Sequence, residues 1–174
     1  MILAIDPGPT ESAFVMLDDN LKPCQFDKGD NAKMLRIVKS YSNENICDHF
    51  AMEMVASYGM AVGKEVFETC VWIGRFWERS QAPYKQFIYR KDEKMNLCHN
   101  MRAKDSNIRQ ALIDRFAKHD LKNGKGTIKN PDWFHGFSKD VWQAYAVGVT
   151  YYDLYLKEGY ANENMQRMQT RKNA

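Results

Sequence analysis

Short apolar runs separated by turn residues dominate the first part of the chain. Residues 2–5 are all apolar and lead directly into Asp6, after which Pro7 and Gly8 predict a turn. An uninterrupted apolar run of this length is typical of a strand that is buried on both faces. A second run over 11–17 follows at hairpin distance and predicts an antiparallel partner for the first strand.

Further along the chain, short apolar runs alternate with segments whose apolar residues recur at helical spacing. Three strands, then helices alternating with strands, then further helices indicate an α/β fold with a mixed sheet and helices on both faces. One domain over residues 1–160 is expected, followed by a polar and flexible tail over 161–174. We expect strands near 2–6, 11–17, 21–27, 50–55 and 84–89, and helices near 30–40, 63–80, 92–98, 106–117 and 138–157.

Cysteine usage and hydropathy narrow the cellular setting. The 174 residues include four widely spaced cysteines without any CxxC pair, which favours reduced thiols over a disulfide framework or a zinc site. No apolar run approaches the roughly 20 residues that a membrane-spanning helix needs. The N-terminal residues lack the pattern of a signal peptide, so a cytoplasmic protein without membrane contact is expected.

Charge is distributed unevenly along the chain. Residues 1–84 carry 8 Lys and Arg against 12 Asp and Glu, whereas residues 85–129 carry 12 against 5. Basic side chains spread over strand, loop and helix could line one groove and meet a phosphate backbone. Charge alone is equally compatible with a solvated, lysine-rich face.

Three acids stand out because of their places in the predicted elements. Asp6 ends the first strand, Glu53 interrupts an apolar run that should lie beside that strand, and Asp140 falls in the first turn of the last helix. Each has an ordinary explanation: Asp6 could cap the turn, Glu53 could be a paired edge residue, and Asp140 could complement the helix dipole. Glu53 is the hardest to explain in this way, because its neighbours are apolar and a buried carboxylate needs a cation. Three converging carboxylates would suit a hard divalent cation such as Mg²⁺.

With these residues in place, the sequence resembles the RuvC family of Holliday-junction resolvases, especially its phage-encoded branch. The similarity rests on AIDPG at 4–8, MEMV at 52–55 and DVWQAYAV at 140–147, in that order. Phage-type members also resemble the stretches 57–69 and 102–109. The resemblance implies a ribonuclease H-like fold, with a five-stranded mixed sheet whose first three strands are antiparallel, and either a bacterial cytoplasm or a phage-infected host as the setting.

The resemblance also implies a metal site with two Mg²⁺ or Mn²⁺ ions. Asp6 and Glu53 match the first two ligands of the family, and Asp140 matches the third. The family usually has a further aspartate one helical turn later, where this chain has Gln143. A neutral amide binds Mg²⁺ more weakly than a carboxylate does, so the second ion is in doubt unless Asp140 serves alone or Glu65 or Glu68 contributes.

The activity implied is Mg²⁺-dependent hydrolysis of phosphodiesters in four-way junctions or other branched DNA, as in recombination and repair. Tyr58 is the nearest aromatic to the place where the family inserts a ring into the opened junction. The helix over 63–80 carries more apolar surface than one face needs, which favours a homodimer, as in the family. The predicted DNA contacts are Tyr58, Lys64, Arg90, Lys94, Arg102, Lys104 and Arg109.

Rival functions remain at this point. The stretch Asp6–Thr10 also fits the Asp-x-Gly-x-Thr turn of actin-like sugar kinases, but those proteins have two lobes and about twice this length. Gln143 leaves open a catalytically weakened protein of the same fold that binds branched DNA. A nuclease that cuts forks, flaps or RNA–DNA hybrids is as compatible with the sequence as one restricted to four-way junctions.

Overall fold

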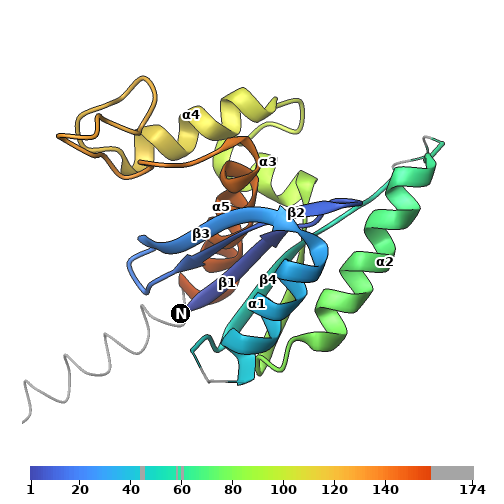
Figure 1. Ribbon diagram of the computed structural model, residues 1–174. Helices are drawn as coiled ribbons and strands as arrows, with labels where there is room; N and C mark the ends of the chain where they lie inside the picture. The colour runs from blue at the N-terminus through green and yellow to red at the C-terminus, as the bar shows by residue number, and fades with distance from the viewer. Residues whose placement is uncertain (44–45, 58, 60, 158–174) are drawn as a thin grey trace, which may run out of the picture.

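A five-stranded sheet forms the centre of the computed structural model, which describes residues 1–43, 46–57, 59 and 61–157 (Figure 1). The spatial order is β3-β2-β1-β4-β5. Neighbours among the first three strands are antiparallel, whereas β4 is parallel to both β1 and β5, so the predicted mixed sheet is confirmed. The strands are β1 (Ile2–Asp6), β2 (Glu11–Leu17), β3 (Pro23–Asp30), β4 (His49–Met54) and β5 (Tyr84–Tyr89).

Helices cover both faces of the sheet, as predicted (Figure 1). Because successive side chains of a strand point to opposite faces, β1 contributes Ile2 and Ala4 to the core under α5, and Leu3 and Ile5 to the core under α1 and α2. This two-sided burial explains why the strand reads as a continuous apolar run. The helices are α1 (Asn31–Asn43), α2 (Lys64–Arg79), α3 (Arg90–Cys98), α4 (Asp105–Phe116) and α5 (Lys139–Tyr151), and a π-helical segment, η1 (Tyr152–Leu156), continues α5.

One predicted boundary was wrong. The third strand begins at Pro23, not near 21, because Asp18 holds a turn by accepting the backbone N–H groups of Asn20 and Lys22 at 2.8 Å each. Leu21 lies in that turn with a φ of 63°, and its carbonyl accepts the Tyr145 hydroxyl. The last helix reaches residue 157 as predicted, but its hydrogen bonding changes from α-helical to π-helical after Tyr151.

Two other helices begin within one residue of the predicted start. α1 was expected from about 30 and begins at Asn31, where Asp30 caps it by accepting the Lys33 N–H at 2.7 Å. α4 was expected from about 106 and begins at Asp105, so Ser106 lies inside its first turn. Lys104 occupies the position before α4, and its N–H donates to the Asn107 side chain at 2.9 Å.

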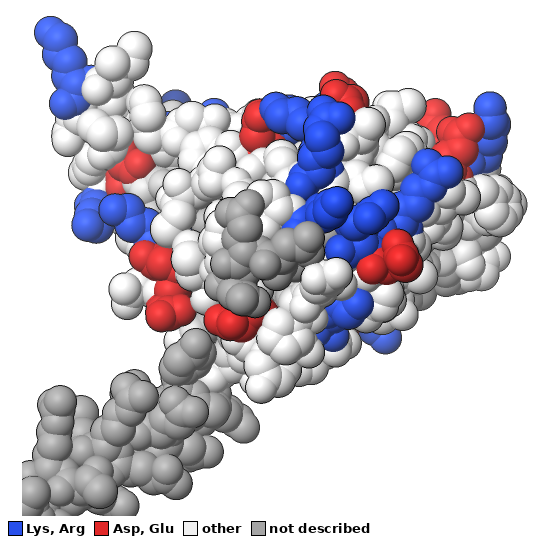
Figure 2. Space-filling view, turned by 60° about the horizontal axis from the view of Figure 1, so that its bottom comes forward, with Lys and Arg blue, Asp and Glu red and all other residues white. Residues whose placement is uncertain are grey.

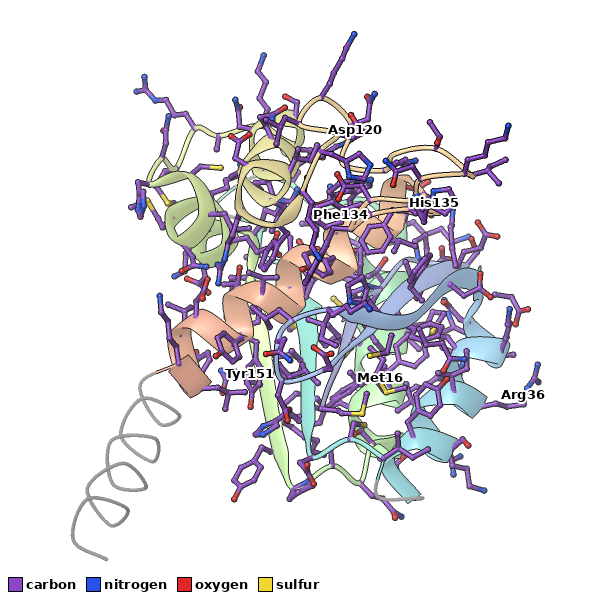
Figure 3. All side chains as sticks on the ribbon, turned by 90° about the vertical axis from the view of Figure 1, so that its left-hand side faces the viewer. Met16, Arg36, Asp120, Phe134, His135 and Tyr151 are labelled. Atoms are coloured by element: carbon purple, nitrogen blue, oxygen red, sulfur yellow. The ribbon has the colours of Figure 1, made fainter. Side chains whose placement is uncertain are left out.

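The segment 117–137, which lies between the predicted helices, folds into a hydrogen-bonded lobe between α4 and α5. The Asp132 carboxylate is its centre, because it accepts the backbone N–H groups of four residues. Figure 3 shows this lobe, marked by Asp120, Phe134 and His135, at the opposite end of α5 from Tyr151. The four donors are Lys118, His119, Asp120 and Trp133.

The layer formed by α1 and α2 has a basic groove on its surface. Lys and Arg side chains gather on the face of the molecule seen in Figure 2. A groove between the two helices is lined by Arg36, Lys39, Arg75 and Arg79, together with the acid Glu78, around an apolar floor that includes Trp72. Residues 1–84 contain more acids than bases, yet they form a basic surface here, because folding places these four cations on one side.

Two expectations about the chain as a whole can be examined directly. All four cysteines are free thiols, as the lack of CxxC pairs predicted. None of the helices among the described residues is both long and apolar enough to cross a bilayer. The expected polar tail, 161–174, and the wedge candidate Tyr58 lie outside the described residues.

Candidate active site

Asp6 and Glu53 meet at the carboxyl edge of the sheet. Parallel pairing places Ile5 opposite Met52, so the residue after each lies at the same level on neighbouring strands. Their carboxyl groups are close enough to hydrogen-bond to each other. The topology therefore produces the predicted acid pair from two residues 47 positions apart, and both acids end up at one edge.

Burial and mutual repulsion make this pair unusual. Burial raises the pKa of Asp6 well above its ordinary value, and the charges of Glu53 and Asp140 raise it further. Burial also raises the pKa of Glu53, although the positive charge of Arg90 works in the opposite direction. Two carboxyl groups in contact share a proton, or they need a cation to be charged together.

The turn after Asp6 is fixed by side chains from β2 and α1. The Gly8 N–H donates to the Ser12 hydroxyl at 3.2 Å, the Ser12 hydroxyl donates to Asn31 at 2.6 Å, and the Asn31 amide donates to the Gly8 carbonyl at 2.9 Å. A Cβ atom on Gly8 would lie 2.3 Å from the Glu11 carbonyl oxygen, so the turn requires glycine. This closed set of hydrogen bonds holds the backbone beside Asp6 in place.

Asp140 approaches the same edge from the first turn of α5. Its carboxylate is paired with Lys28 at 2.8 Å, and Lys28 also reaches Glu11 at 3.0 Å. Asp6, Lys28 and Asp140 line one shallow hollow of about 290 Å³. Asp6 and Asp140 therefore border the same hollow, where Lys28 is paired with Asp140, and Glu53 contacts Asp6 from β4.

A fourth acid, Glu93, belongs to this region and was missed in the sequence. Its side chain is fully buried, one carboxylate oxygen pairs with the Arg90 guanidinium, and the other has no hydrogen-bond partner among the described residues. Burial raises its pKa well above the ordinary value, and the nearby charge of Glu53 adds to the effect. Arg90 also binds Asp105 at 2.5 Å.

The sequence carried only a weak signal for Glu93. It lies in the run Arg90–Lys94, where acids and bases alternate as they do on a solvated helix face. Leu97, one turn later, packs against the core and indicates that this face of α3 is turned inward. The predicted DNA contact Arg90 is likewise held in ion pairs beside the acids.

The donor set fits a divalent cation in its chemistry. Within the described ranges, no cluster of three or more His, Cys, Asp or Glu side chains has the geometry of a metal site. The contact between Asp6 and Glu53 nevertheless gathers carboxylate oxygens that repel each other, and such oxygens are the ligands that Mg²⁺ and Mn²⁺ prefer. Asp140 would join them once its pairing with Lys28 is exchanged.

The other candidate ligands have different surroundings. Gln143 lies one turn after Asp140 on α5 but lines a different cavity, together with Asp105. On α2, Glu65 is exposed, and Glu68 is paired with Lys64 at 3.2 Å.

The predicted DNA-contacting cations differ in their freedom to move. Lys64 is 87% exposed, whereas Lys94 is partly buried. Arg102 and Lys104 are exposed around the start of α4. The Arg109 guanidinium lies over the Trp142 ring, 4.8 Å from its centroid.

Comparison with known proteins places this geometry in a structural class. No protein-family model matches the sequence, and no curated protein matches it significantly. The structure is similar to RuvC of Thermus thermophilus, with a TM-score of 0.64 and 12% identity over 91% of this chain and 96% of that one. It is also similar to T. thermophilus RuvC in complex with a Holliday-junction substrate, with a TM-score of 0.62 and 10% identity over 86% and 90% of the two chains.

The sequence identities of these two matches are too low for sequence alone to relate the proteins. The matches cover nearly the whole of both chains, so the likeness concerns the complete architecture and not a shared βαβ unit. The five-stranded mixed sheet and its flanking helices therefore form a RuvC-like, ribonuclease H-like fold.

Proposed function

We propose that this protein is a Mg²⁺-dependent, structure-selective DNA endonuclease that resolves four-way junctions or other branched DNA by phosphodiester hydrolysis. One observation carries the proposal: in a RuvC-like fold, Asp6 and Glu53 are in contact at the carboxyl ends of two parallel strands, and Asp140 lines the same hollow as Asp6. A junction-bound RuvC among the similar structures supports branched DNA as the substrate class.

In this proposal, the residues of the site divide the work between them. Asp6 and Glu53 would hold the cations, with Asp6 as the central ligand. Asp140 would complete the site after leaving Lys28. Two bound Mg²⁺ or Mn²⁺ ions would supply a hydroxide at neutral pH and stabilise charge on the leaving 3′-oxygen. Lys28, once released, is a cation within reach of the phosphate that enters the hollow.

Binding of the DNA outside the hollow is assigned to exposed cations. Arg102 and Lys104 lie at the start of α4, and they would neutralise phosphates on the strand that leads into the site. Lys64, Lys94 and Arg109 remain candidates for the same role, whereas Arg90 is held beside the acids. The actin-like kinase alternative is less favoured, since the structure resembles RuvC over most of both chains.

A homodimer is part of the proposal, since symmetric cleavage of a four-way junction needs two sites that face opposite strands. On α2, Phe67 is 61% exposed and Val71, one turn later, is 54% exposed. Apolar side chains at this spacing form a stripe that a second copy would cover. Sedimentation of the Phe67→Glu variant tests it: we expect a monomer, and an unchanged dimer would remove α2 from the interface.

The experiment that tests the function is a cleavage assay with Mg²⁺ on four-way junctions, forks and plain duplex. We expect Asp6→Asn to reduce cleavage at least a thousandfold while junction binding survives, because the amide keeps the shape of the side chain but removes its charge. Asp19→Asn, which changes an exposed aspartate near the N-terminus, is the matched control and should cleave normally. Normal cleavage by Asp6→Asn would eliminate the proposed site.

A catalytically weakened protein that binds branched DNA is the second candidate. It is favoured by the neutral Gln143 and by the pairing of Asp140 with Lys28. The same assay separates the two, since this candidate binds junctions without cutting them. In the nuclease, we expect Gln143→Asp to cleave as fast as or faster than the wild type, and a large loss would mean that the amide has a role of its own.

A further inference from the structure

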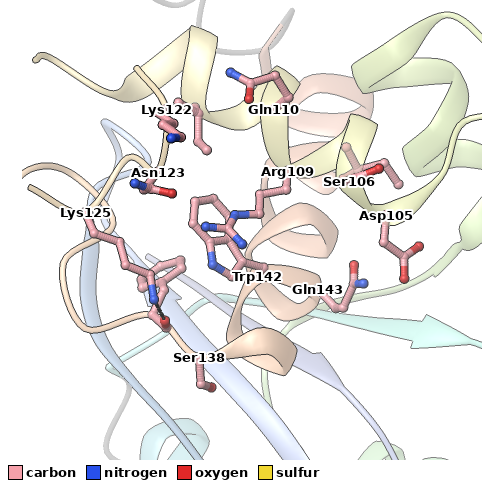
Figure 4. Close-up of a pocket in the computed structure, with 13 residues that line it drawn as sticks. Asp105, Ser106, Arg109, Gln110, Lys122, Asn123, Lys125, Ser138, Trp142 and Gln143 are labelled. Atoms are coloured by element: carbon pink, nitrogen blue, oxygen red, sulfur yellow. Dashed lines mark hydrogen bonds between the residues drawn. The ribbon is translucent and has the colours of Figure 1, made fainter. Parts of the chain in front are cut away.

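A cavity of about 610 Å³ lies beside the candidate active site, between α4, the lobe 117–137 and the start of α5 (Figure 4). Its size falls within the range of pockets that hold small organic ligands. Gln143 connects it to the acid hollow, because this residue lines the cavity one helical turn after Asp140. Asp105 does so as well, because it pairs with Arg90 next to Glu53.

One wall of the cavity is a guanidinium plane that is fixed in position. Figure 4 shows Arg109 over Trp142, and its Cζ atom lies 4.8 Å from the ring centroid. Trp142 is itself immobilised, since it is 5% exposed and packs against Phe134 with ring centroids 4.3 Å apart. Among the described residues, the N–H groups of Arg109 have no hydrogen-bond or ion-pair partner, so they remain available to a ligand.

The opposite wall carries two lysines and an amide. Lys122 and Asn123 come from the lobe, and Lys125 donates to the Phe137 carbonyl at the cavity edge. The backbone here is rigid, because the Asp120 carboxylate accepts the N–H groups of Asn123 and Lys125 at 3.0 and 3.1 Å. The backbone that carries these residues is therefore held in place, and the Lys125 ammonium is fixed at the cavity edge.

The charge balance of the cavity favours an anion. Three cations, Arg109, Lys122 and Lys125, line it against a single acid, Asp105, which is already neutralised by Arg90. A flat cation and an apolar floor favour an aromatic group, and the lysines favour a phosphate. A nucleotide combines both features, whereas a base inside a duplex is stacked and cannot enter a cavity.

We infer that this cavity binds one unpaired nucleotide of the DNA strand beside the cleaved bond, with its base against Arg109 and its phosphate near Lys122 and Lys125. The inference rests on the proposed nuclease function and explains its selectivity. Forks and flaps present unpaired nucleotides, and a four-way junction does so once base pairs at its branch point open, whereas intact duplex keeps its bases stacked. The cavity therefore favours branched DNA over plain duplex.

The test is binding of a 12-nucleotide oligodeoxythymidine in EDTA, which needs neither metal nor cleavage. Lys122→Ala should weaken binding about threefold and lower the slope of log affinity against log salt by about 0.7, the value for one lost contact with a single strand. Arg109→Lys should weaken binding about tenfold without changing this slope, because the charge stays and the plane is lost. Lys129→Ala is the control, since this exposed lysine lies on the same lobe but does not line the cavity.

A second measurement guards against a folding defect. The fluorescence of a 2-aminopurine base in the oligonucleotide should change on binding to the wild type and to Lys129→Ala, because the base leaves its stacked neighbours, and the change should disappear in Arg109→Lys while its thermal unfolding stays unchanged. Equal affinity and an equal fluorescence change in all these variants would overturn the inference. Asp6→Asn should bind the oligonucleotide normally, so a failure of the cavity and a failure of the catalytic site give different results.

Discussion

Two groups of buried acids in this molecule behave in opposite ways. Asp132 lies inside the lobe 117–137, where burial opposes its ionisation but four backbone N–H donors outweigh that effect and hold its pKa well below the ordinary value. Asp6, Glu53 and Glu93 lie at the sheet edge, where burial raises the pKa of all three and the negative charge of Glu53 raises those of Asp6 and Glu93 further. Burial alone therefore does not mark a functional acid.

The difference lies in what surrounds each carboxylate. The carboxylate oxygens of Asp132 accept hydrogen bonds from the backbone of its own lobe. Asp132 therefore stabilises the fold and does not serve a ligand. The acids of the sheet edge face each other, and one oxygen of Glu93 has no partner among the described residues. Such a group costs stability in the free protein, and that cost is typical of a site that awaits a cation.

The largest expected effect in this comparison is on Asp132. Its replacement by alanine leaves four backbone N–H groups without their acceptor, so we expect a loss of about 3 kcal/mol in the free energy of unfolding. Urea denaturation measures it. Asp114→Ala, at an exposed acid of α4, should change stability by less than about 0.5 kcal/mol. A loss below about 1 kcal/mol for Asp132→Ala would contradict the structural role.

The next effect is a pH dependence of opposite sign at the two places. A raised pKa means that the folded protein binds more protons than the unfolded chain, so in EDTA the acids of the sheet edge lower stability as the pH rises above about 4. Asp132, with its lowered pKa, instead contributes stability that is lost as the pH falls below about 4.

The Asp6→Asn variant tests the loss of stability that the acids of the sheet edge cause at higher pH. Removing one of the repelling charges should raise the free energy of unfolding at pH 8 in EDTA by about 1 kcal/mol, roughly that of one pKa unit, with little change at pH 4. Thermal unfolding at the two pH values checks it. A variant less stable than the wild type at pH 8 would mean that the acid pair stabilises the fold and is not a strained site.

The smallest effect concerns Lys28, which holds Asp140 in the free protein. Both side chains are partly exposed, so the pair is weak and a cation should displace the lysine. We expect Lys28→Gln to lower the Mn²⁺ concentration for half-maximal binding about two- to fivefold. Weaker binding would show that Lys28 orients Asp140 for the cation and does not compete with it.

Much of the fold could be predicted from local patterns in the sequence. The strands could be predicted because burial on both faces of β1 and β4 requires continuous apolar runs, and Asp30 marked the start of α1 through its capping hydrogen bond. The meeting of Asp6 and Glu53 followed from one further assumption, that the two strands are parallel neighbours, which the pairing confirms.

Contacts between distant parts of the chain could not be predicted. Asp132 organises residues 12 to 14 positions earlier, and no local pattern reveals that its acceptors are used in this way. Glu93 reads as a solvated residue until α3 is docked against the sheet. The basic groove of α1 and α2 was hidden because charges were summed along the chain, whereas the helices present them on one side.

Direct binding of Mn²⁺, followed by the EPR signal of the free ion, tests the central claim that the crowded acids at the sheet edge are a cation site. We expect the wild type and Asp132→Asn, where it remains folded, to bind Mn²⁺ with similar affinity, and Asp6→Asn to lose at least tenfold. Equal binding by the wild type and Asp6→Asn would contradict the account.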